Sequence, residues 1–215
     1  MRNVIALSAG QLGCPPVQEP TVAAWVINFS ARFSGMDEWL SVAESQIRAA
    51  SAQGADIFVM PEYVSDSWLS FAPPEAVQPV SEPWQAVQGA RFLGIMQDLA
   101  CRYSLMIVAG SFCVPLEDGT WRNRCHTFMP DGSFAVQDKL HLMPDERATE
   151  GLEEGDAIHL IDWNGLRIAI VICLDTQIPG AIHALLQEGQ PDLVIIPSMT
   201  IRQSGFNRVF PCAAA

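Results

Sequence analysis

The feature that most constrains the fold of this sequence is a run of five apolar residues, 168–172, that leads directly into a thiol, Cys173. An acid, Asp175, follows two residues later, and the turn residues Pro179 and Gly180 come soon after. A short apolar run bounded by turn signals is typical of a buried strand. Such a strand would deliver Cys173 to the rim of a sheet, where a thiol needs a base, a cation and an oxyanion site to act as a nucleophile.

Other short apolar runs alternate along the chain with segments of helical periodicity. We expect strands at residues 21–29, 56–60, 105–112, 121–129, 133–137, 157–161, 166–172 and 192–197. We expect helices at residues 36–53, 83–102 and 178–187, a further helix opening at 206–215, a proline-rich loop at 71–83 and a polar, acidic loop at 144–156. This alternation predicts a single α/β domain built on a central sheet.

Composition narrows the class of protein. A chain of 215 residues that is 49% hydrophobic can bury a sizeable core. The formal net charge of -12 argues against nucleic acid or an anionic membrane as a partner, because both would repel the chain. No apolar run approaches the ~20 residues of a membrane span. The first fifteen residues resemble a signal peptide only faintly, because their apolar run is short and no A-x-A site follows it.

The six cysteines are consistent with a reducing compartment. No two of them have CxxC spacing, so neither a zinc knuckle nor a thioredoxin-like motif is indicated. Most lie in apolar surroundings and are interpreted as small core residues, which favours a cytoplasmic location. We expect no metal and no cofactor.

Three polar residues follow predicted strands, and together they suggest a site. Glu62 comes after the run 58–61, Lys139 follows the predicted hairpin around Asp131 and Gly132, and Cys173 ends its own run. Ligands bind beyond the carboxyl ends of parallel strands, so these three side chains form a coherent set. Taken singly, the thiol would be a core residue, the acid a loop residue and the lysine a solvated surface residue.

The motifs around these residues resemble the nitrilase superfamily of carbon-nitrogen hydrolases. They are MPEY at 60–63, DKLHL at 138–142 and VICLD at 171–175, in that order, and the resemblance extends over residues 21–215. A further acid, Glu146, lies seven residues past Lys139 and matches the second active-site glutamate of the family, with Glu150 as the alternative.

The resemblance implies an αββα sandwich and hydrolysis of a C–N bond through a cysteine thioester. By this resemblance Glu62 is the general base, and Lys139 with the backbone N–H of Leu174 stabilises the oxyanion. Glu146 orients the substrate or assists proton transfer. Tyr63, with Trp68 and Met199, is a candidate for the substrate pocket, although such residues are more often core. His141 is expected to pack or to hydrogen-bond, and Asp175 to fix the loop after the thiol.

Two departures from the family pattern shape the expected function. Leu174 and Asp175 follow the thiol where true nitrilases usually carry Trp and Glu, which favours an amide or carbamoyl substrate over a nitrile. Family members also usually continue well past residue 215, so we expect a C-terminally incomplete hydrolase domain at 21–215. Residues 1–20 lack clear periodicity beyond the apolar run 4–7, so we expect an N-terminal extension there. The expected protein is a homo-oligomeric hydrolase of small molecules, and a non-catalytic assembly subunit that retains the fold stays open as an alternative.

Overall fold

The computed structural model describes residues 19–77, 80–148, 151–200 and 207–208, and within them the chain forms two sheets. The larger sheet has the order β1-β2-β3-β4-β5, and the smaller has the order β6-β7-β8. Pairing is parallel from β1 to β3 and between β7 and β8, and antiparallel from β3 to β5 and between β6 and β7. The strands are β1 (Val22–Ala24), β2 (Ile57–Val59), β3 (Met106–Pro115), β4 (Trp121–Phe128), β5 (Phe134–Asp138), β6 (Leu160–Trp163), β7 (Leu166–Ile170) and β8 (Leu193–Ile195).

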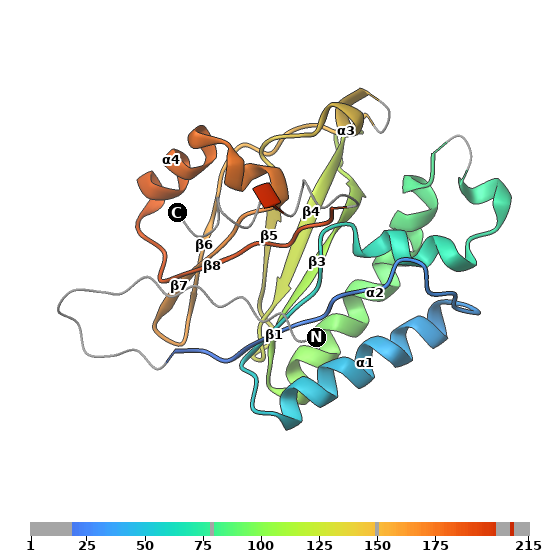
Figure 1. Ribbon diagram of the computed structural model, residues 1–215, viewed down its shortest axis with the longest axis horizontal. Coiled ribbons are helices and arrows are strands. Elements are labelled where there is room, and N and C mark those ends of the chain that lie inside the picture. Colours follow the sequence, from blue (N-terminus) through green and yellow to red (C-terminus); the bar gives the residue numbers. More distant parts are fainter. Residues whose placement is uncertain (1–18, 78–79, 149–150, 201–206, 209–215) are drawn as a thin grey trace.

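Helices cover the outer face of each sheet, as Figure 1 shows. Helices α1 (Met36–Ala52) and α2 (Glu82–Tyr103) lie on the larger sheet, and α4 (Pro179–Glu188) lies on the smaller. A third buried cluster joins the inner faces of the two sheets. The four layers therefore form the αββα sandwich that the resemblance predicted.

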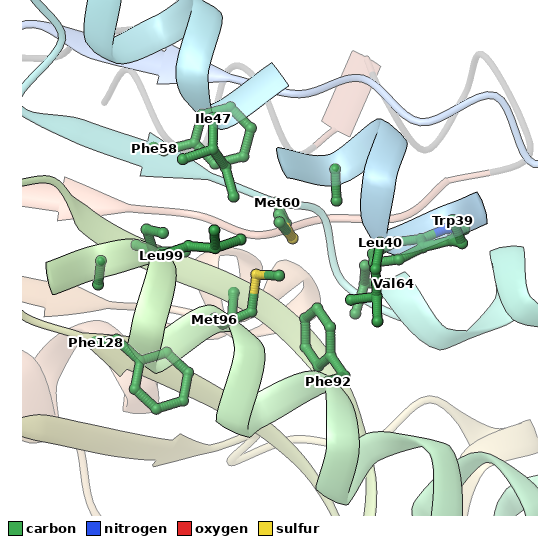
Figure 2. Close-up of a cluster of buried hydrophobic side chains, with 14 of the residues drawn as sticks. Trp39, Leu40, Ile47, Phe58, Met60, Val64, Phe92, Met96, Leu99 and Phe128 are labelled. Atoms are coloured by element: carbon green, nitrogen blue, oxygen red, sulfur yellow. The ribbon is translucent and has the colours of Figure 1, made fainter. Parts of the chain in front are cut away.

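The layer of α1 and α2 forms because both helices present an apolar stripe. The buried residues of α1 recur at helical spacing, and they face Phe92, Met96 and Leu99 of α2 (Figure 2). Trp39 and Phe92 meet edge to face, with ring centroids 5.7 Å apart. The buried stripe of α1 consists of Met36, Trp39, Leu40, Ala43, Ile47 and Ala50.

The apolar run that ends at Cys173 is continuous because both of its faces are buried. Ile168, Ile170 and Ile172 point into the cluster between the sheets. Ala169 and Val171 point the other way, into the cluster under α4. This period of two, with both faces covered, is the pattern of a central strand in a sandwich.

The structure corrects several predicted boundaries. The strand expected at 21–29 ends at Ala24, because its partner β2 is itself only three residues long. The strand expected at 157–161 lies instead at Leu160–Trp163. Asn164 and Gly165 have φ of +51° and +79°, and this two-residue turn pairs Trp163 with Leu166 and so sets the register.

The loop predictions were wrong in part as well. The proline-rich segment at 71–83 contains the 3-10 helix η2 (Pro74–Val77), and it follows another, η1 (Val64–Phe71). The acidic segment at 144–156 opens with α3 (Pro144–Ala148), whose first residue is a proline, as is common at helix starts. The expected extension at 1–20 and the expected helix at 206–215 lie almost wholly outside the described residues. No helix in the described part of the chain is long and apolar enough to span a bilayer.

Candidate active site

Glu62 lies in a tight turn after β2. Its side chain is 2% exposed. The turn passes close to β3, where the Ser111 N–H donates to the Pro61 carbonyl over 3.3 Å and the strand register shifts. Gly110, at φ +71°, makes this approach possible, because a Cβ there would lie 2.2 Å from the Pro61 oxygen. Tyr63 follows in the left-handed region, at φ +50°, and turns the chain into η1.

Cys173 lies in a strained turn after β7. It is the first residue of the 3-10 helix η3 (Cys173–Gln177) and has φ of +43°, which costs a residue other than glycine roughly 1–2 kcal/mol. Its N–H donates to the Pro197 carbonyl over 3.0 Å, just past β8. Its Sγ lies 3.9 Å from the Met199 carbonyl oxygen. The segments that follow β7 and β8 therefore position the thiol jointly.

Lys139 directly follows β5 and is 2% exposed. Its Nζ lies 2.8 Å from Oε1 of Glu62 and 2.8 Å from each carboxylate oxygen of Glu146. Burial alone would lower the pKa of Lys139, but the two carboxylates outweigh it and raise the pKa. The ammonium is therefore a permanent positive charge between two buried acids.

Glu146 lies on α3 and is 4% exposed. Its Oε2 accepts the Met143 N–H over 2.6 Å, and its Oε1 accepts the Tyr63 hydroxyl over 2.5 Å. The predicted second glutamate thus lies beside Lys139. The alternative, Glu150, lies outside the described residues.

The pKa values of Glu62 and Cys173 are both raised in this site. Burial raises the pKa of Glu62, and its contacts with Lys139 and with the Met199 N–H, 3.0 Å from Oε2, only partly oppose this. Burial also raises the pKa of Cys173 to about 12, helped by the neighbouring Glu62 carboxylate and opposed by Lys139. The resting thiol is therefore protonated and has a carboxylate beside it.

Asp175 joins the turn of Cys173 to the segment after Lys139. Its carboxylate accepts the N–H groups of Leu140 and His141 over 3.1 and 2.8 Å, and its Oδ1 lies 3.0 Å from Nδ1 of His141. Asp175 is buried, and this burial raises its pKa. Asp175 thus fixes the loop, and His141 hydrogen-bonds to it.

Leu174 is half-buried and is the second residue of η3. The first N–H groups of a helix have no intrahelical acceptor, so the Leu174 N–H has none within η3. Trp68 is different, because it is fully buried among Trp39, Phe92 and Phe112 and so belongs to the core.

Sequence reasoning missed Asn123 and understated Met199. Asn123 is fully buried, and its Nδ2 lies 3.3 Å from Glu62 Oε1 and 3.2 Å from Glu146 Oε1. The predicted hairpin held a signal, because a turn at Asp131 and Gly132 brings position 123 beside Lys139. In the structure the Lys139 N–H donates to the Asn123 carbonyl over 2.9 Å. Met199 contributes through its backbone, which no residue pattern reveals.

No group of three or more His, Cys, Asp or Glu side chains is placed to hold a metal ion within residues 19–77, 80–148 and 151–200. The polar centre consists instead of two acids, a lysine, an amide and a thiol. Such a set can move a proton between sulfur and carboxylate beside a fixed positive charge. It is suited to nucleophilic attack by the thiol on a polarised carbon.

Comparison with known proteins identifies the family of this chain. Residues 20–207 match the model of the carbon-nitrogen hydrolase family. A probable hydrolase of Bacillus subtilis, YhcX, is 30% identical over 183 residues, which are 83% of this chain and 34% of that protein. An (R)-stereoselective amidase of Pseudomonas sp. is 27% identical over 68% of this chain and 50% of its own length. The chain thus spans a third to a half of these relatives.

Solved structures show the same fold. A mutant of the Nesterenkonia AN1 amidase, from the nitrilase superfamily, superimposes with a TM-score of 0.70 and 19% identity. The match covers 93% of this chain and 73% of that one. The chain therefore belongs to the carbon-nitrogen hydrolase family.

Proposed function

We propose that this chain is a hydrolase that cleaves a non-peptide C–N bond of a small amide or carbamoyl compound through a thioester on Cys173. The observation that carries the proposal is the position of Lys139, 2.8 Å from both Glu62 and Glu146. A buried cation held by two acids beside a thiol is costly for the fold, and it has a direct use in acyl transfer.

In the first step Glu62 takes the proton from the Cys173 thiol as Sγ attacks the substrate carbonyl. A thiol whose pKa is about 12 holds little free thiolate, so proton transfer accompanies the attack. Oε1 of Glu62 already accepts from Lys139 and Asn123, whereas Oε2 accepts the N–H of Met199, whose carbonyl lies beside the thiol. We assign the proton to Oε2.

The tetrahedral intermediate then collapses. The proton on Glu62 passes to the leaving nitrogen, the C–N bond breaks, and ammonia or an amine departs from a thioester on Cys173. Glu62 next takes a proton from water, which attacks the thioester carbon and releases the acid and the thiol. Atoms and charges balance without any other reactant.

Negative charge on the substrate oxygen would be stabilised by Lys139 and the Leu174 N–H. The pKa of Lys139 is raised, so the residue acts as a fixed charge and not as a proton donor. Preorganised donors of this kind contribute roughly 10²–10³ in rate. Glu146 would hold Lys139 in place and orient the substrate. We assign Tyr63 to the support of Glu146, because its hydroxyl donates to that carboxylate.

A nitrile is the second candidate substrate, because a nitrilase of Pyrococcus abyssi is 27% identical over 75% of this chain. Leu174 and Asp175 after the thiol favour the amide. The net charge of -12 favours a small molecule over nucleic acid, and the buried free thiol of Cys125 fits a cytoplasmic protein. By its resemblance we further propose a homo-oligomer that needs no cofactor.

The test is release of ammonia or amine from a panel of small amides, carbamoyl amines and nitriles. We expect turnover of at least one amide or carbamoyl compound by the wild type and none by Cys173→Ala. A Thr127→Val variant, which changes a buried residue of β4 outside the polar centre, should retain activity. Equal turnover by Cys173→Ala would contradict the mechanism. A thiol no more reactive than free cysteine, with no turnover, would favour a non-catalytic assembly subunit.

A further inference from the structure

Asn123 occupies an unusual position between two acids. It lies on β4, is fully buried, and its Nδ2 is 3.3 Å from Oε1 of Glu62 and 3.2 Å from Oε1 of Glu146. A carboxylate without a proton can only accept, so the amide must present its NH2 group to both acids. Each of the two amide hydrogens then has one carboxylate oxygen as its acceptor.

The same two oxygens also accept from Lys139, each at 2.8 Å. Lys139 and Asn123 therefore form a closed ring with one oxygen of each acid. Two carboxylates at one site would otherwise tend to share a proton, because like charges raise one of the two pKa values. A cation and a neutral amide together supply donors to both acids and add only one positive charge.

The position of Asn123 has a cost that packing does not explain. Its Oδ1 is buried and has no hydrogen-bond partner in the described part of the chain. An unsatisfied buried acceptor is destabilising, and an apolar residue would fill a buried site on β4 without that cost. The contacts of the NH2 group are the feature that an apolar residue could not provide.

We propose that Asn123 is a positioning residue that holds Glu62 and Glu146 against Lys139 and favours the ionised form of Glu62. It occupies Oε1 of Glu62 and so leaves Oε2 as the oxygen that serves Cys173. This role deepens the proposed C–N hydrolysis and rests on it for the reaction that Glu62 serves. The charged or titratable groups that face Glu62 are Lys139 after β5, Glu146 on α3, Cys173 on η3 and Asp66 on η1.

The test is a titration of the glutamate carboxyl carbons by NMR in protein labelled with ¹³C-glutamate. Signals are assigned by their loss in Glu62→Gln and Glu146→Gln. In Asn123→Leu, which keeps the approximate size and removes both donors, we expect the titration midpoint of Glu62 to rise by about half to one pH unit. Asn123→Asp, which adds a third acid, should raise it further, and Thr127→Val on the same strand should leave it unchanged.

The acidic limb of kcat/KM should move to higher pH with the Glu62 midpoint, because the base must be ionised to act. A residue that only supports the fold would lower activity without moving either midpoint. The proposal would be overturned if Asn123→Leu or Asn123→Asp folded and left the titration midpoint of Glu62 unchanged. If Asn123→Leu does not fold, Asn123→Asp alone provides the test. If the wild type turned over no substrate, the proposed function would fail while the NMR comparison still tested Asn123.

Discussion

Replacement of Lys139 by methionine should destabilise the protein far more than the loss of a surface ion pair of the same length. At an effective dielectric constant of 20, charges 2.8 Å apart attract by about 6 kcal/mol, and Lys139 makes such contacts with both Glu62 and Glu146. Desolvation offsets much of this attraction. Removing one partner of a buried pair nonetheless costs about 3–5 kcal/mol, because the remaining charge stays buried and unpaired.

An exposed ion pair provides the matched control. Arg102 Nη1 lies 2.9 Å from Glu44 Oε1, but the two side chains are 58% and 37% exposed. Exposed pairs of this kind contribute about 0–1 kcal/mol, so Arg102→Met should lie within that range. The two variants thus share nearly the same contact distance and differ in burial.

The assay is urea unfolding followed by tryptophan fluorescence, since Trp39 and Trp68 are fully buried. Adding Glu146→Gln to Lys139→Met removes one of the two unpaired charges, and it should recover about half of the lost stability or more. Burial already raises the folded-state pKa of Glu62, and without the cation this pKa rises further. The stability that protonation gives is present at low pH and lost as pH rises, so the deficit of Lys139→Met should be larger at pH 8 than at pH 5.

Lys139→Met should also lose roughly 10²–10³ in kcat. A loss of stability no larger than that of Arg102→Met would refute the reasoning, because it would mean that the cation is not needed to neutralise the two acids. An unchanged deficit after addition of Glu146→Gln would refute it as well.

Three further predictions concern the turns and the base. Cys173→Gly and Cys173→Ala should both be inactive, but the glycine variant should be the more stable by about 1 kcal/mol in urea unfolding, because φ at this position is +43°; a more stable alanine variant would contradict the strained turn. The folded-state pKa of Glu62 is raised, so the contribution of Glu62 to stability is present at low pH and lost as pH rises through that pKa. The free energy of unfolding of Glu62→Gln should therefore rise relative to that of the wild type between pH 5 and pH 8. A fall in this difference over the same range would contradict the raised pKa. Gly110→Ala should cost about 2 kcal/mol or more and reduce turnover, because its Cβ would lie 2.2 Å from the Pro61 oxygen, whereas Gly94→Ala, with nothing within 4 Å, should gain about 0.5–1 kcal/mol; similar thermal midpoints for the two would count against the close approach.

The sequence predicted the parts of the fold that have a strong period. Helix α1 was expected at 36–53 and lies at Met36–Ala52, because its buried residues recur on one face. The apolar run before Cys173 was recognisable because a central strand buries both faces. The strand expected at 157–161 was misplaced, because the two-residue turn at Asn164 and Gly165 sets the register there and apolar content does not.

The site was predictable to the extent that it lies at strand ends. Glu62, Lys139 and Glu146 meet as the ordered motifs suggested. Asn123 was missed because a single amide within a strand has no sequence pattern of its own. Only the pairing of β4 with β5 places it beside Lys139. The backbone of Met199 was beyond prediction, because it acts through groups that every residue has.

The central claim is that Cys173 forms a thioester, and rapid-quench intact-mass spectrometry tests it most directly. The wild type would be mixed with an amide that it turns over, quenched in acid and digested. We predict an added mass equal to the acyl group on the peptide that contains Cys173, removed by hydroxylamine and absent from Cys173→Ala. Steady turnover without this adduct at any quench time, or an adduct of equal amount on Cys173→Ala, would contradict the account.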